Sequence, residues 1–250
     1  MAHRYGWKPS LPGVLATAAD TTGLAVKPEV DPRNALPPIF DQGQLGSCTA
    51  NATAAAFEYD AHLDGRTTGR LSRLWIYYYE RAIEGSLGQG DTGAFGSDAF
   101  KVASIDGICA ETYWPYKIAK FQNEPSAKAK SEATYHLTKP THLVAQSESA
   151  FKRVLSNNQT IAFGFTVYES FEDDSRWSRG EMPIPIKGES VLGGHEVLMV
   201  GYIKAAPGFM LCRNSWGTSW QELGGYFLFP TAELVKRSVC SDFRTIVRSL

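Results

Sequence analysis

The sequence predicts an α+β protein in which a mainly helical half precedes a half built from antiparallel strands. Two observations lead to this prediction. Small apolar residues recur at helical spacing before about residue 140, whereas short bulky segments separated by turn residues follow it. The chain has 250 residues, which suffices for two lobes that share one interface. Its 43% apolar and 20% charged residues are typical of an ordered globular protein.

Charge and cysteine content exclude several functions. The formal net charge of −1 leaves no broad basic field for nucleic acid or an anionic membrane surface. No apolar run approaches the ~18 residues that a membrane span requires. Four scattered cysteines without a C-x-x-C pair disfavour a disulfide scaffold and a structural zinc site. We therefore expect a soluble monomer without metal or cofactor and without a recognisable signal peptide, either cytoplasmic or exported by a route not visible in the sequence.

The first 38 residues are rich in proline and lack helical periodicity, so they are expected to form an extended arm on the surface. Regular structure is expected after the turn Asp41-Gln42-Gly43. Ser47 stands at the N-cap position of a first helix, which starts at Cys48 and carries small residues at helical spacing. The expected helices are 48–61, 72–83 and about 97–105, the last ending before Gly107.

The second half follows a polar segment from Tyr116 to His142, which is expected to cross between the two halves. Beyond it, β-branched and aromatic residues gather in short segments with turns between them, which predicts antiparallel strands. The expected strands are Ile161–Val167, Glu196–Tyr202, Phe209–Arg213 and Gly225–Phe229.

Cys48 is the first candidate for chemistry. A cysteine in the first turn of a helix lies where unpaired backbone N–H groups and the helix dipole favour the thiolate, the form that attacks carbonyl groups. The glycine before Ser47 lets a substrate approach the backbone closely. On position alone, a small buried cysteine without a chemical role explains Cys48 equally well.

His195 and Asn214 are the other two candidates. Gly193 and Gly194 place His195 at the mouth of a strand, where its ring can project into a cleft. Asn214 opens a segment with two tryptophans, and its amide can fix the tautomer of an imidazole. Taken singly, a surface or capped histidine and a turn asparagine are the more frequent explanations of such residues.

Together, these residues resemble the papain family of cysteine peptidases in their order and spacing. The distance from Cys48 to His195 falls within the ~130–150 positions typical of this arrangement, and Asn214 lies slightly beyond that window. The resemblance covers the chain from about Val30 to the C-terminus. Further segments that carry it are Val30–Arg33, Asp41–Gly43, Thr112–Tyr116 and Asn214–Trp220.

The resemblance implies a papain-like fold with the active-site cleft between two lobes. The peptidase domain would span residues 30–250, with a helical lobe at about 38–140 and an antiparallel, β-barrel-like lobe at about 141–250. The implied activity is that of a cysteine endopeptidase acting on polypeptide substrates through a thioester acyl-enzyme.

The resemblance also implies a role for each matching residue. Cys48 would be the nucleophile and His195 the general base and then acid. Asn214 would orient His195, with Trp216 shielding that pair. Gln42 would join the Cys48 backbone N–H in the oxyanion hole, where loss of one donor costs ~10²–10³ in rate.

For the expected substrate-binding segment, the alignment with the family leaves the register open by one residue. The segment with Gly93, Ala94 and Phe95 resembles the cleft edge that pairs with the main chain of a substrate, and Gly93 is the expected contact. Gly194 and Glu196 would line the pocket for the second side chain upstream of the cut. We hypothesise that Glu196 favours Arg or Lys there; a solvent-facing or locally paired Glu196 is the equal alternative.

Several positions depart from the family pattern. Gly194 stands where many members have Asp or Asn, and Glu196 stands where a small residue is usual. Leu45 and Asp91 stand where the family usually has two cysteines that form a disulfide, so that bond is missing. Thr49 follows the nucleophile where a bulky aromatic residue is usual. The absent disulfide fits a bacterial-type member or a reducing compartment.

The arm of residues 1–29 is shorter than the folded inhibitory propeptides of the family. Its composition suits an extended strand, and a self-inhibitory arm that covers the cleft is a second hypothesis. Two rival functions remain open at this point: a catalytically silent papain-fold binding protein, and a thiol isopeptidase or transpeptidase of narrow specificity. A thioester is resolved by an amine as well as by water, so the sequence does not separate these reactions.

Overall fold

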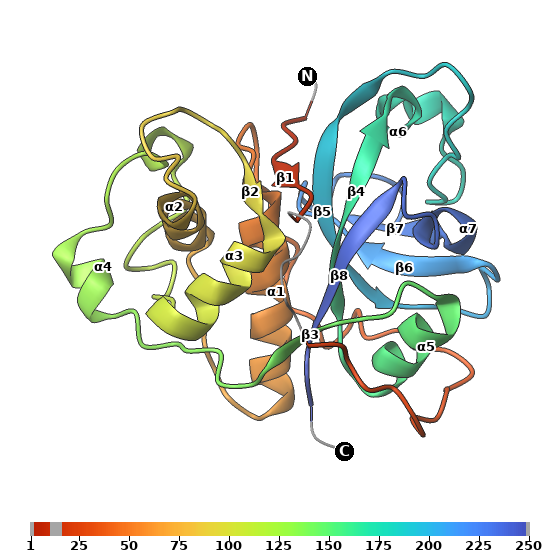
Figure 1. The fold of residues 1–250 in the computed structure, drawn as a ribbon, viewed down its shortest axis with the longest axis horizontal. Coiled ribbons are helices and arrows are strands. Elements are labelled where there is room, and N and C mark those ends of the chain that lie inside the picture. The colour runs from red at the N-terminus through yellow and green to blue at the C-terminus, as the bar shows by residue number, and fades with distance from the viewer. Residues whose placement is uncertain (1–2, 11–16, 249–250) are drawn as a thin grey trace.

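The structure is a computed structural model that describes residues 3–10 and 17–248. Helices form one half of the molecule and a sheet forms the other, with the N-terminal segment between their upper ends (Figure 1). This arrangement confirms the predicted α+β class. The strand order is β3-β8-β4-β5-β6-β7, and the two edge strands β3 and β7 do not pair with each other in the described part of the chain. The second half is therefore an open antiparallel sheet and not a closed barrel.

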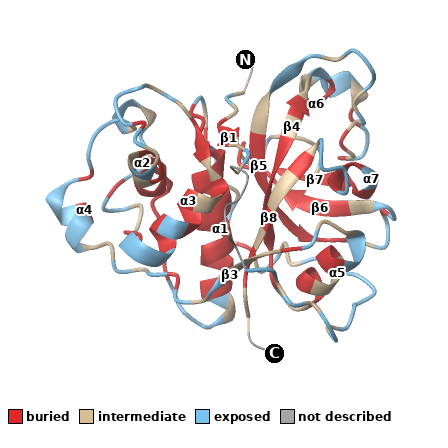
Figure 2. Ribbon diagram, in the orientation of Figure 1, coloured by how far each residue is buried: buried red, intermediate tan, exposed pale blue. Residues whose placement is uncertain are grey.

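The central helix α1 (Cys48–Leu63) is buried along almost its whole length (Figure 2). It packs against helices α2 (Arg73–Ile83) and α3 (Gly96–Lys101) on one side and strand β5 (Val191–Gly201) on the other. Alanine-rich faces allow this close packing, because short side chains let backbones approach one another. The helix that carries Cys48 is thus held by both halves.

The helix starts follow two different patterns. Ser72 caps α2, since its hydroxyl accepts the backbone N–H of Trp75 at 3.2 Å. Ser47 precedes α1 as expected but does not cap it with its side chain. Its hydroxyl instead bonds the Tyr116 hydroxyl at 2.6 Å and accepts from the Asn51 amide at 3.1 Å. The α1 start is therefore fixed by tertiary contacts, which leave its first N–H groups available near Cys48.

The third predicted helix is present in two parts. Helix α3 covers Gly96–Lys101 and continues as a π-helical turn, η1 (Val102–Asp106). Gly107 ends it with a φ of 73°, in the left-handed region that glycine adopts without strain.

The sheet contains the four expected strands and two that the sequence did not predict. Strands β4 (Ile161–Tyr168), β6 (Phe209–Arg213) and β7 (Tyr226–Pro230) lie close to the predicted bounds, and β5 begins five residues earlier. Strand β8 (Cys240–Ile246) was missed because its inward and outward residues do not alternate regularly. Strand β3 (Thr141–Leu143) is too short to show a pattern.

The remaining elements are short. Strands β1 (Trp7–Lys8) and β2 (Ala94–Phe95) pair in parallel between the two halves. Single-turn and surface helices cover the outside of the molecule: η2 (Ile118–Lys120), α4 (Ala127–Ser131), α5 (Glu148–Ser156), α6 (Glu169–Glu172), η3 (Asp174–Arg176) and α7 (Thr231–Leu234).

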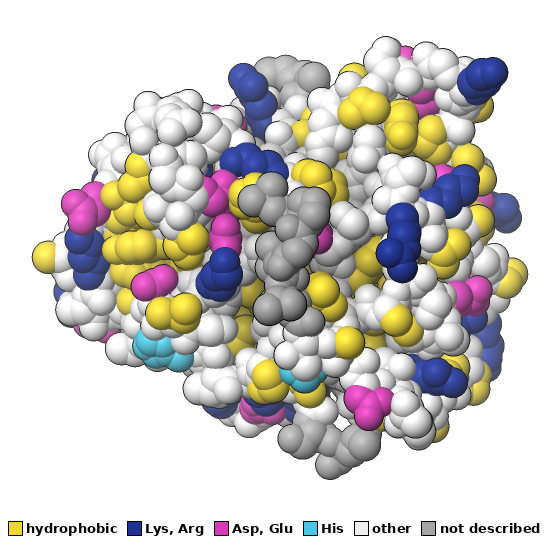
Figure 3. All heavy atoms as spheres, viewed as in Figure 1, with side chains coloured by type: hydrophobic (Ala, Val, Ile, Leu, Met, Phe, Trp, Pro, Cys, Tyr) yellow, Lys and Arg dark blue, Asp and Glu magenta, His cyan; other side chains and the backbone are white. Residues whose placement is uncertain are grey.

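Two hydrophobic clusters form the interior. One lies around α1, α2 and α3 and includes Leu198 and Val200 of β5; the other lies among the sheet strands and α5. On the face in Figure 3, basic and acidic side chains are interspersed, and neither sign gathers in one field. Within the described residues, no helix has the length and apolar character to cross a bilayer, and no group of three or more metal-ligating side chains occurs.

Candidate active site

Cys48 lies at the first turn of α1, and its side chain is fully buried. The backbone N–H groups of Glu196 in β5 and Gly6 in the arm are directed at its sulfur. Burial raises the pKa of the Cys48 thiol to about 12, and the nearby carboxyl groups of Glu196 and Glu80 add to that rise. In this closed state the sulfur is a neutral thiol.

His195 and Asn214 form a hydrogen-bonded pair beside this helix end. The distance from His195 Nε2 to Asn214 Oδ1 is 2.8 Å. The same Oδ1 accepts the backbone N–H of Ser215, so it is the acceptor and Nε2 carries the proton. His195 Nδ1 is then the basic nitrogen, and it has no hydrogen-bond partner among the described residues.

The imidazole of His195 is enclosed by aromatic rings. Trp216 stacks on it with ring centroids 4.8 Å apart, and Phe165 and Tyr5 contact it edge-on. Burial lowers the pKa of His195 to about 4, against the opposing effect of the Asn214 hydrogen bond. The ring is therefore neutral at neutral pH and able to accept a proton on Nδ1.

Gln42 links three parts of the site. Its side-chain Nε2 donates to the Leu45 carbonyl at 2.9 Å and to the Arg4 carbonyl of the arm at 3.2 Å. Its Oε1 accepts the Ser215 hydroxyl at 2.6 Å, which ties the helical half to the sheet. A peptide carbonyl from the arm thus already lies against the amide that sequence analysis assigned to an oxyanion hole.

The segment 93–95 pairs with the arm through its main chain. Ala94 donates its N–H to the Gly6 carbonyl at 2.7 Å, and Trp7 and Lys8 pair in register with Ala94 and Phe95. A Cβ on Gly93 would lie only 2.0 Å from the Gly6 carbonyl oxygen. Gly93, at a φ of 66°, is thus in close contact with the main chain of the arm.

The sheet contacts the arm through side chains. The Trp7 indole covers Gly164, where an added Cβ would lie 1.8 Å from the ring. It also covers Gly194, where an added Cβ would lie 2.7 Å from the ring and 2.4 Å from the Trp7 carbonyl oxygen. His3 stacks on Trp216 at 3.7 Å between ring centroids. The arm therefore crosses the whole site.

Comparison with known proteins identifies this arrangement. Residues 26–241 match the family model described as papain family cysteine protease. The chain belongs to the papain family. Cys48, Gln42, His195 and Asn214 all fall inside the matched region.

Relatives in the papain family come from diverse organisms. A protein of Acanthamoeba polyphaga mimivirus, described as an uncharacterized peptidase C1-like protein, is 37% identical over 82% of this chain and 68% of its own length. Cysteine proteinase 3 of Entamoeba histolytica is 29% identical over 82% of this chain and 63% of its own length. This chain thus spans about two thirds of these two relatives.

A solved structure of the papain family is similar along the full chain. Xylellain, a cysteine protease from Xylella fastidiosa, shares 32% sequence identity at a TM-score of 0.87, with 99% of both chains covered. Because both cover values are so high, the similarity includes the arm as well as the two lobes.

The departures from the papain-family pattern have structural explanations. All four cysteines are free, including Cys48. Thr49 is buried, and its hydroxyl donates to the Glu80 carboxyl at 2.8 Å. Glu80 is itself completely buried, and burial raises its pKa well above the ordinary value. Thr49 thus makes a buried polar contact with α2.

Glu196 neither faces solvent nor pairs locally, so the alternative that we weighed for it is wrong. The residue is 2% exposed, and its Oε1 has no hydrogen-bond partner among the described residues. A Cβ on Gly96 at the start of α3 would lie 2.0 Å from Glu196 Oε2, so this glycine makes room for the carboxyl. Burial raises the pKa of Glu196 well above its usual value; Asp242 adds to the rise and Arg244 opposes it.

Several residues of the site escaped sequence analysis. Glu172 of α6 binds the arm from the sheet side: it accepts from the Tyr5 hydroxyl, and its Oε1 lies 3.1 Å from His3 Nδ1. Gly164 packs directly against the Trp7 indole. Neither residue belongs to a local motif, and only the tertiary fold brings them to the arm.

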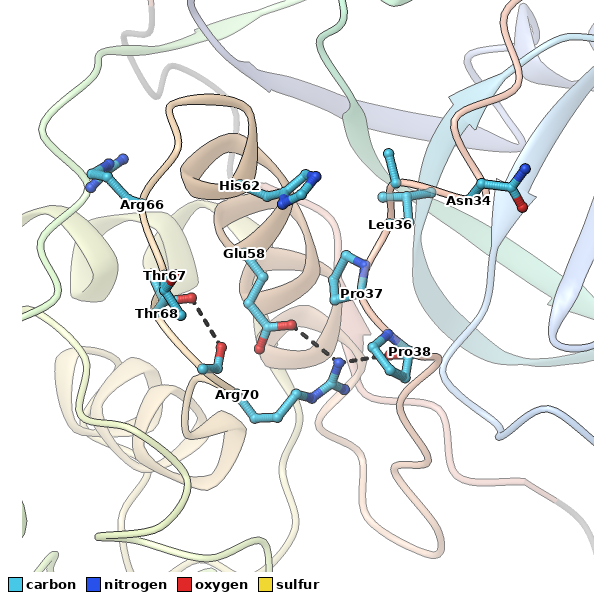
Figure 4. Close-up of a pocket in the computed structure, with 12 residues that line it drawn as sticks. Asn34, Leu36, Pro37, Pro38, Glu58, His62, Arg66, Thr67, Thr68 and Arg70 are labelled. Atoms are coloured by element: carbon cyan, nitrogen blue, oxygen red, sulfur yellow. Dashed lines mark hydrogen bonds and ion pairs between the residues drawn. The ribbon is translucent and has the colours of Figure 1, made fainter.

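A separate surface pocket lies away from this site (Figure 4). It has a volume of about 450 Å³ between the last turns of α1, the loop 66–70 and the segment 34–38. Glu58 points from α1 toward Arg70, whose guanidinium lies 3.2 Å from the carboxylate and donates to the Pro38 carbonyl. These side chains fasten the segment 34–38 to the helical half.

Proposed function

We propose that the chain is a cysteine endopeptidase in which Cys48, His195, Asn214 and Gln42 carry out the reaction. The observation that supports this most directly is the Arg4 carbonyl at the Gln42 amide, 3.2 Å away, beside Cys48. This contact supports the proposal, because a peptide main chain lies in the site with a carbonyl at the amide proposed as an oxyanion-hole donor.

The proposed reaction begins when a substrate replaces the arm. Cys48 transfers its proton to His195 Nδ1, and the sulfur attacks the carbonyl carbon to form a C–S bond. Gln42 Nε2–H and the Cys48 N–H donate to the resulting oxyanion. Collapse breaks the C–N bond, and His195 returns its proton to the leaving amine. Water, deprotonated by His195, then hydrolyses the thioester and restores the thiol.

Asn214 supports each of these proton transfers. Because its Oδ1 holds the proton on Nε2, the reacting nitrogen is always Nδ1. Trp216 covers this pair, and exclusion of water strengthens the hydrogen bond between them.

The arm is proposed to inhibit the enzyme by filling the site. Cys48 and His195 are both 0% exposed, and Gly6, Trp7 and His3 lie against the residues expected to bind a substrate. Solved neighbours with a similar fold include a procathepsin L of Tenebrio molitor and a ragweed pollen cysteine protease in its proform. In this chain a short extended arm would serve where those proteins have a propeptide.

Glu196 is proposed to select a basic side chain in the pocket that Trp7 now fills. Gly164 and Glu196 are direct cross-strand partners and therefore share one face of the sheet. The Trp7 indole N–H and Glu196 Oε1 are both buried without partners among the described residues. A planar guanidinium in the same place would fit the slot and supply a donor to that carboxyl.

Active-site labelling tests the peptidase proposal. We expect a papain-directed epoxide to modify the full chain once, at Cys48, and expect fluorogenic peptides to be cleaved. Cys48→Ala should abolish both signals. Labelling without cleavage of any library peptide would favour the silent binding protein, and amide products with an added amine would favour the transpeptidase.

A single small substitution in the full chain tests the proposal that the arm inhibits the enzyme. A Cβ on Gly6 would lie 1.8 Å from the Gly46 carbonyl oxygen, so Gly6→Ala should unseat the arm. We expect at least ~10-fold faster labelling of Cys48, the effect of ~1.4 kcal/mol. Thr22→Ala, in an exposed part of the arm, is the matched control. Equal labelling rates in wild type, variant and control would rule out inhibition by the arm.

A further inference from the structure

Asp91 connects the loop before the nucleophile to the edge that pairs with the main chain of a substrate. Its Oδ2 accepts the Gly46 backbone N–H at 2.9 Å, and its Oδ1 lies 3.2 Å from the same nitrogen. Gly46 is buried two residues before Cys48, so its N–H needs a protein partner. Asp91 supplies that partner from the other side of the loop.

Tyr77 extends this connection to Gly93. The Tyr77 hydroxyl donates to Asp91 Oδ1, and the Tyr77 hydroxyl oxygen accepts the Gly93 backbone N–H at 3.1 Å. Tyr77 is completely buried in α2, and the Arg81 guanidinium lies over its ring at 4.4 Å. The phenol is therefore held by the helix, and it fixes both partners relative to α2.

The four groups form one hydrogen-bonded path: Gly46 N–H, Asp91 carboxylate, Tyr77 hydroxyl and Gly93 N–H. The path begins beside the nucleophile and ends at the residue in closest contact with the arm main chain. The space along it is tight, since a Cβ on Gly46 would lie 3.0 Å from Asp91 Oδ1. A change in Asp91 would therefore shift both ends.

We propose that Asp91, together with Tyr77, positions Cys48 and Gly93 relative to each other and replaces the disulfide that the family usually has at positions 45 and 91. This inference rests on the proposed peptidase function. Leu45 is 1% exposed and packs in the core, while Asp91 makes the link with hydrogen bonds. A hydrogen-bonded link holds the loop equally well in reducing and oxidising surroundings, which a disulfide does not.

The two ends of the path should respond differently to substitution. Asp91→Ala removes the acceptor of Gly46 and the partner of Tyr77, so it should disturb the nucleophile and the pairing edge together. Tyr77→Phe removes the acceptor of Gly93 and the donor to Asp91 Oδ1 but keeps the hydrogen bond between Asp91 and Gly46, so it should weaken peptide binding and leave the thiol in place. Asp91→Asn keeps one oxygen acceptor, so its alkylation rate and kcat should lie between those of wild type and Asp91→Ala.

Two measurements on the full chain separate these effects. Alkylation of Cys48 by iodoacetamide is measured on variants that also carry Gly6→Ala, so that the arm does not limit access to the thiol. It then reports the nucleophile, because this reagent makes no main-chain pairing; peptide hydrolysis reports kcat and KM. We expect Asp91→Ala to reduce alkylation rate and kcat by roughly 30- to 100-fold and Asp91→Asn by roughly 10-fold. Tyr77→Phe should raise KM by roughly 10-fold at an unchanged alkylation rate.

Asp106→Asn is the control, since Asp106 is an exposed aspartate of the same half outside the path. The proposal is overturned if Asp91→Ala and Asp91→Asn alkylate and hydrolyse like Asp106→Asn. It is also overturned if the Asp91 variants only lower the melting temperature while kcat, KM and alkylation rate stay unchanged. If wild type is alkylated at Cys48 but cleaves no peptide, the proposed function fails, and the alkylation series still tests the link.

Discussion

The two walls of the cleft hold the arm by different means. On the helical side, Ala94 donates a backbone hydrogen bond to Gly6, and Gly46 and Gly93 approach its main chain closely. On the sheet side, Trp7 lies on Gly164 and Gly194, and His3 stacks on Trp216. Contacts to the arm main chain thus predominate on the helical side, where Lys8 adds an ion pair with Glu84. Contacts to arm side chains predominate on the sheet side, where Gly194 also lies close to the Trp7 carbonyl oxygen.

This difference separates general affinity from selectivity. Main-chain hydrogen bonds form with any extended peptide, so residues of the helical wall should affect all substrates alike. A pocket on the sheet wall discriminates, because it fits some side chains and excludes others. The contrast yields four predictions, of which the first two compare one glycine from each wall.

Gly93→Ala should have the largest effect. The added Cβ would lie 2.0 Å from the position of a paired carbonyl, at a φ of 66° that alanine adopts with strain. We expect kcat/KM to fall by roughly 100-fold for all peptides of a library, as misplacement near 1 Å does. Gly85→Ala is a matched control, since its φ is also 66° and nothing lies within 4 Å of its Cβ. A loss restricted to certain side chains would contradict the main-chain role of this wall.

Gly164→Ala should have a smaller and selective effect. Its Cβ would lie 1.8 Å from the Trp7 indole, so it would narrow the slot on the sheet side. We expect kcat/KM to fall by roughly 30-fold for peptides with a large planar side chain in this pocket and to stay constant for alanine there. An equal fall in kcat/KM for all peptides of the library would show that Gly164 affects main-chain binding, as the helical wall does, and would contradict the difference between the two walls.

Glu196→Gln should lower the preference for arginine over leucine by roughly 10-fold, the worth of one charge-assisted hydrogen bond. Burial raises the pKa of Glu196, so the acid ionises only as the pH rises, and the wild-type preference for arginine should increase with pH. Asp242 and Arg244 of β8 shift the pKa of Glu196, upward and downward respectively. The charge of Glu196 in turn raises the pKa of Glu80 in α2. Specificity profiles at several pH values should show an arginine preference that does not change with pH in Glu196→Gln. The same pH dependence in wild type and variant would disprove the role assigned to Glu196.

Glu172→Gln should have the smallest effect, roughly 3- to 5-fold faster labelling of Cys48, because one partly exposed ion pair and one hydrogen bond to the arm are weakened. Burial opposes its ionisation, but hydrogen bonds from Tyr5 and His3 lower the pKa of Glu172 below 4.5. Its contribution to arm closure is therefore present above about pH 4.5 and is lost as the pH falls through the lowered pKa.

Titration of His195 should change arm closure in the wild type in the same direction: closure weakens as the pH falls. Its pKa is lowered from 6.5 to about 4 in the closed state, so protonation between these values favours the open state. The ratio of labelling rates of Gly6→Ala to wild type should therefore decrease toward one as the pH falls. A ratio that rises in acid would show that other groups control the arm.

The fold was predicted well where local patterns are strong. Helices α1 and α2 and strands β4 and β6 carry clear periodicity or bulky runs, and their positions matched. Strand β8 was missed because its ladder with β4 contains a register shift, which breaks the alternation of its side chains. The papain-like fold is confirmed, but the lobe predicted as barrel-like is an open sheet in the described residues, since pairing between edge strands depends on the curvature of the whole sheet.

The sequence alone determined the class of the protein and predicted Cys48, Gln42, His195 and Asn214 as its catalytic residues, because their joint order and spacing resemble the papain family. Only the tertiary structure decided that the arm lies in the cleft, that the buried Glu196 has no hydrogen-bond partner for its Oε1 among the described residues, and that Asp91 links Gly46 to Tyr77. The physical reason is that these contacts join segments far apart in the chain, and local sequence carries no record of which segments the packed core brings together.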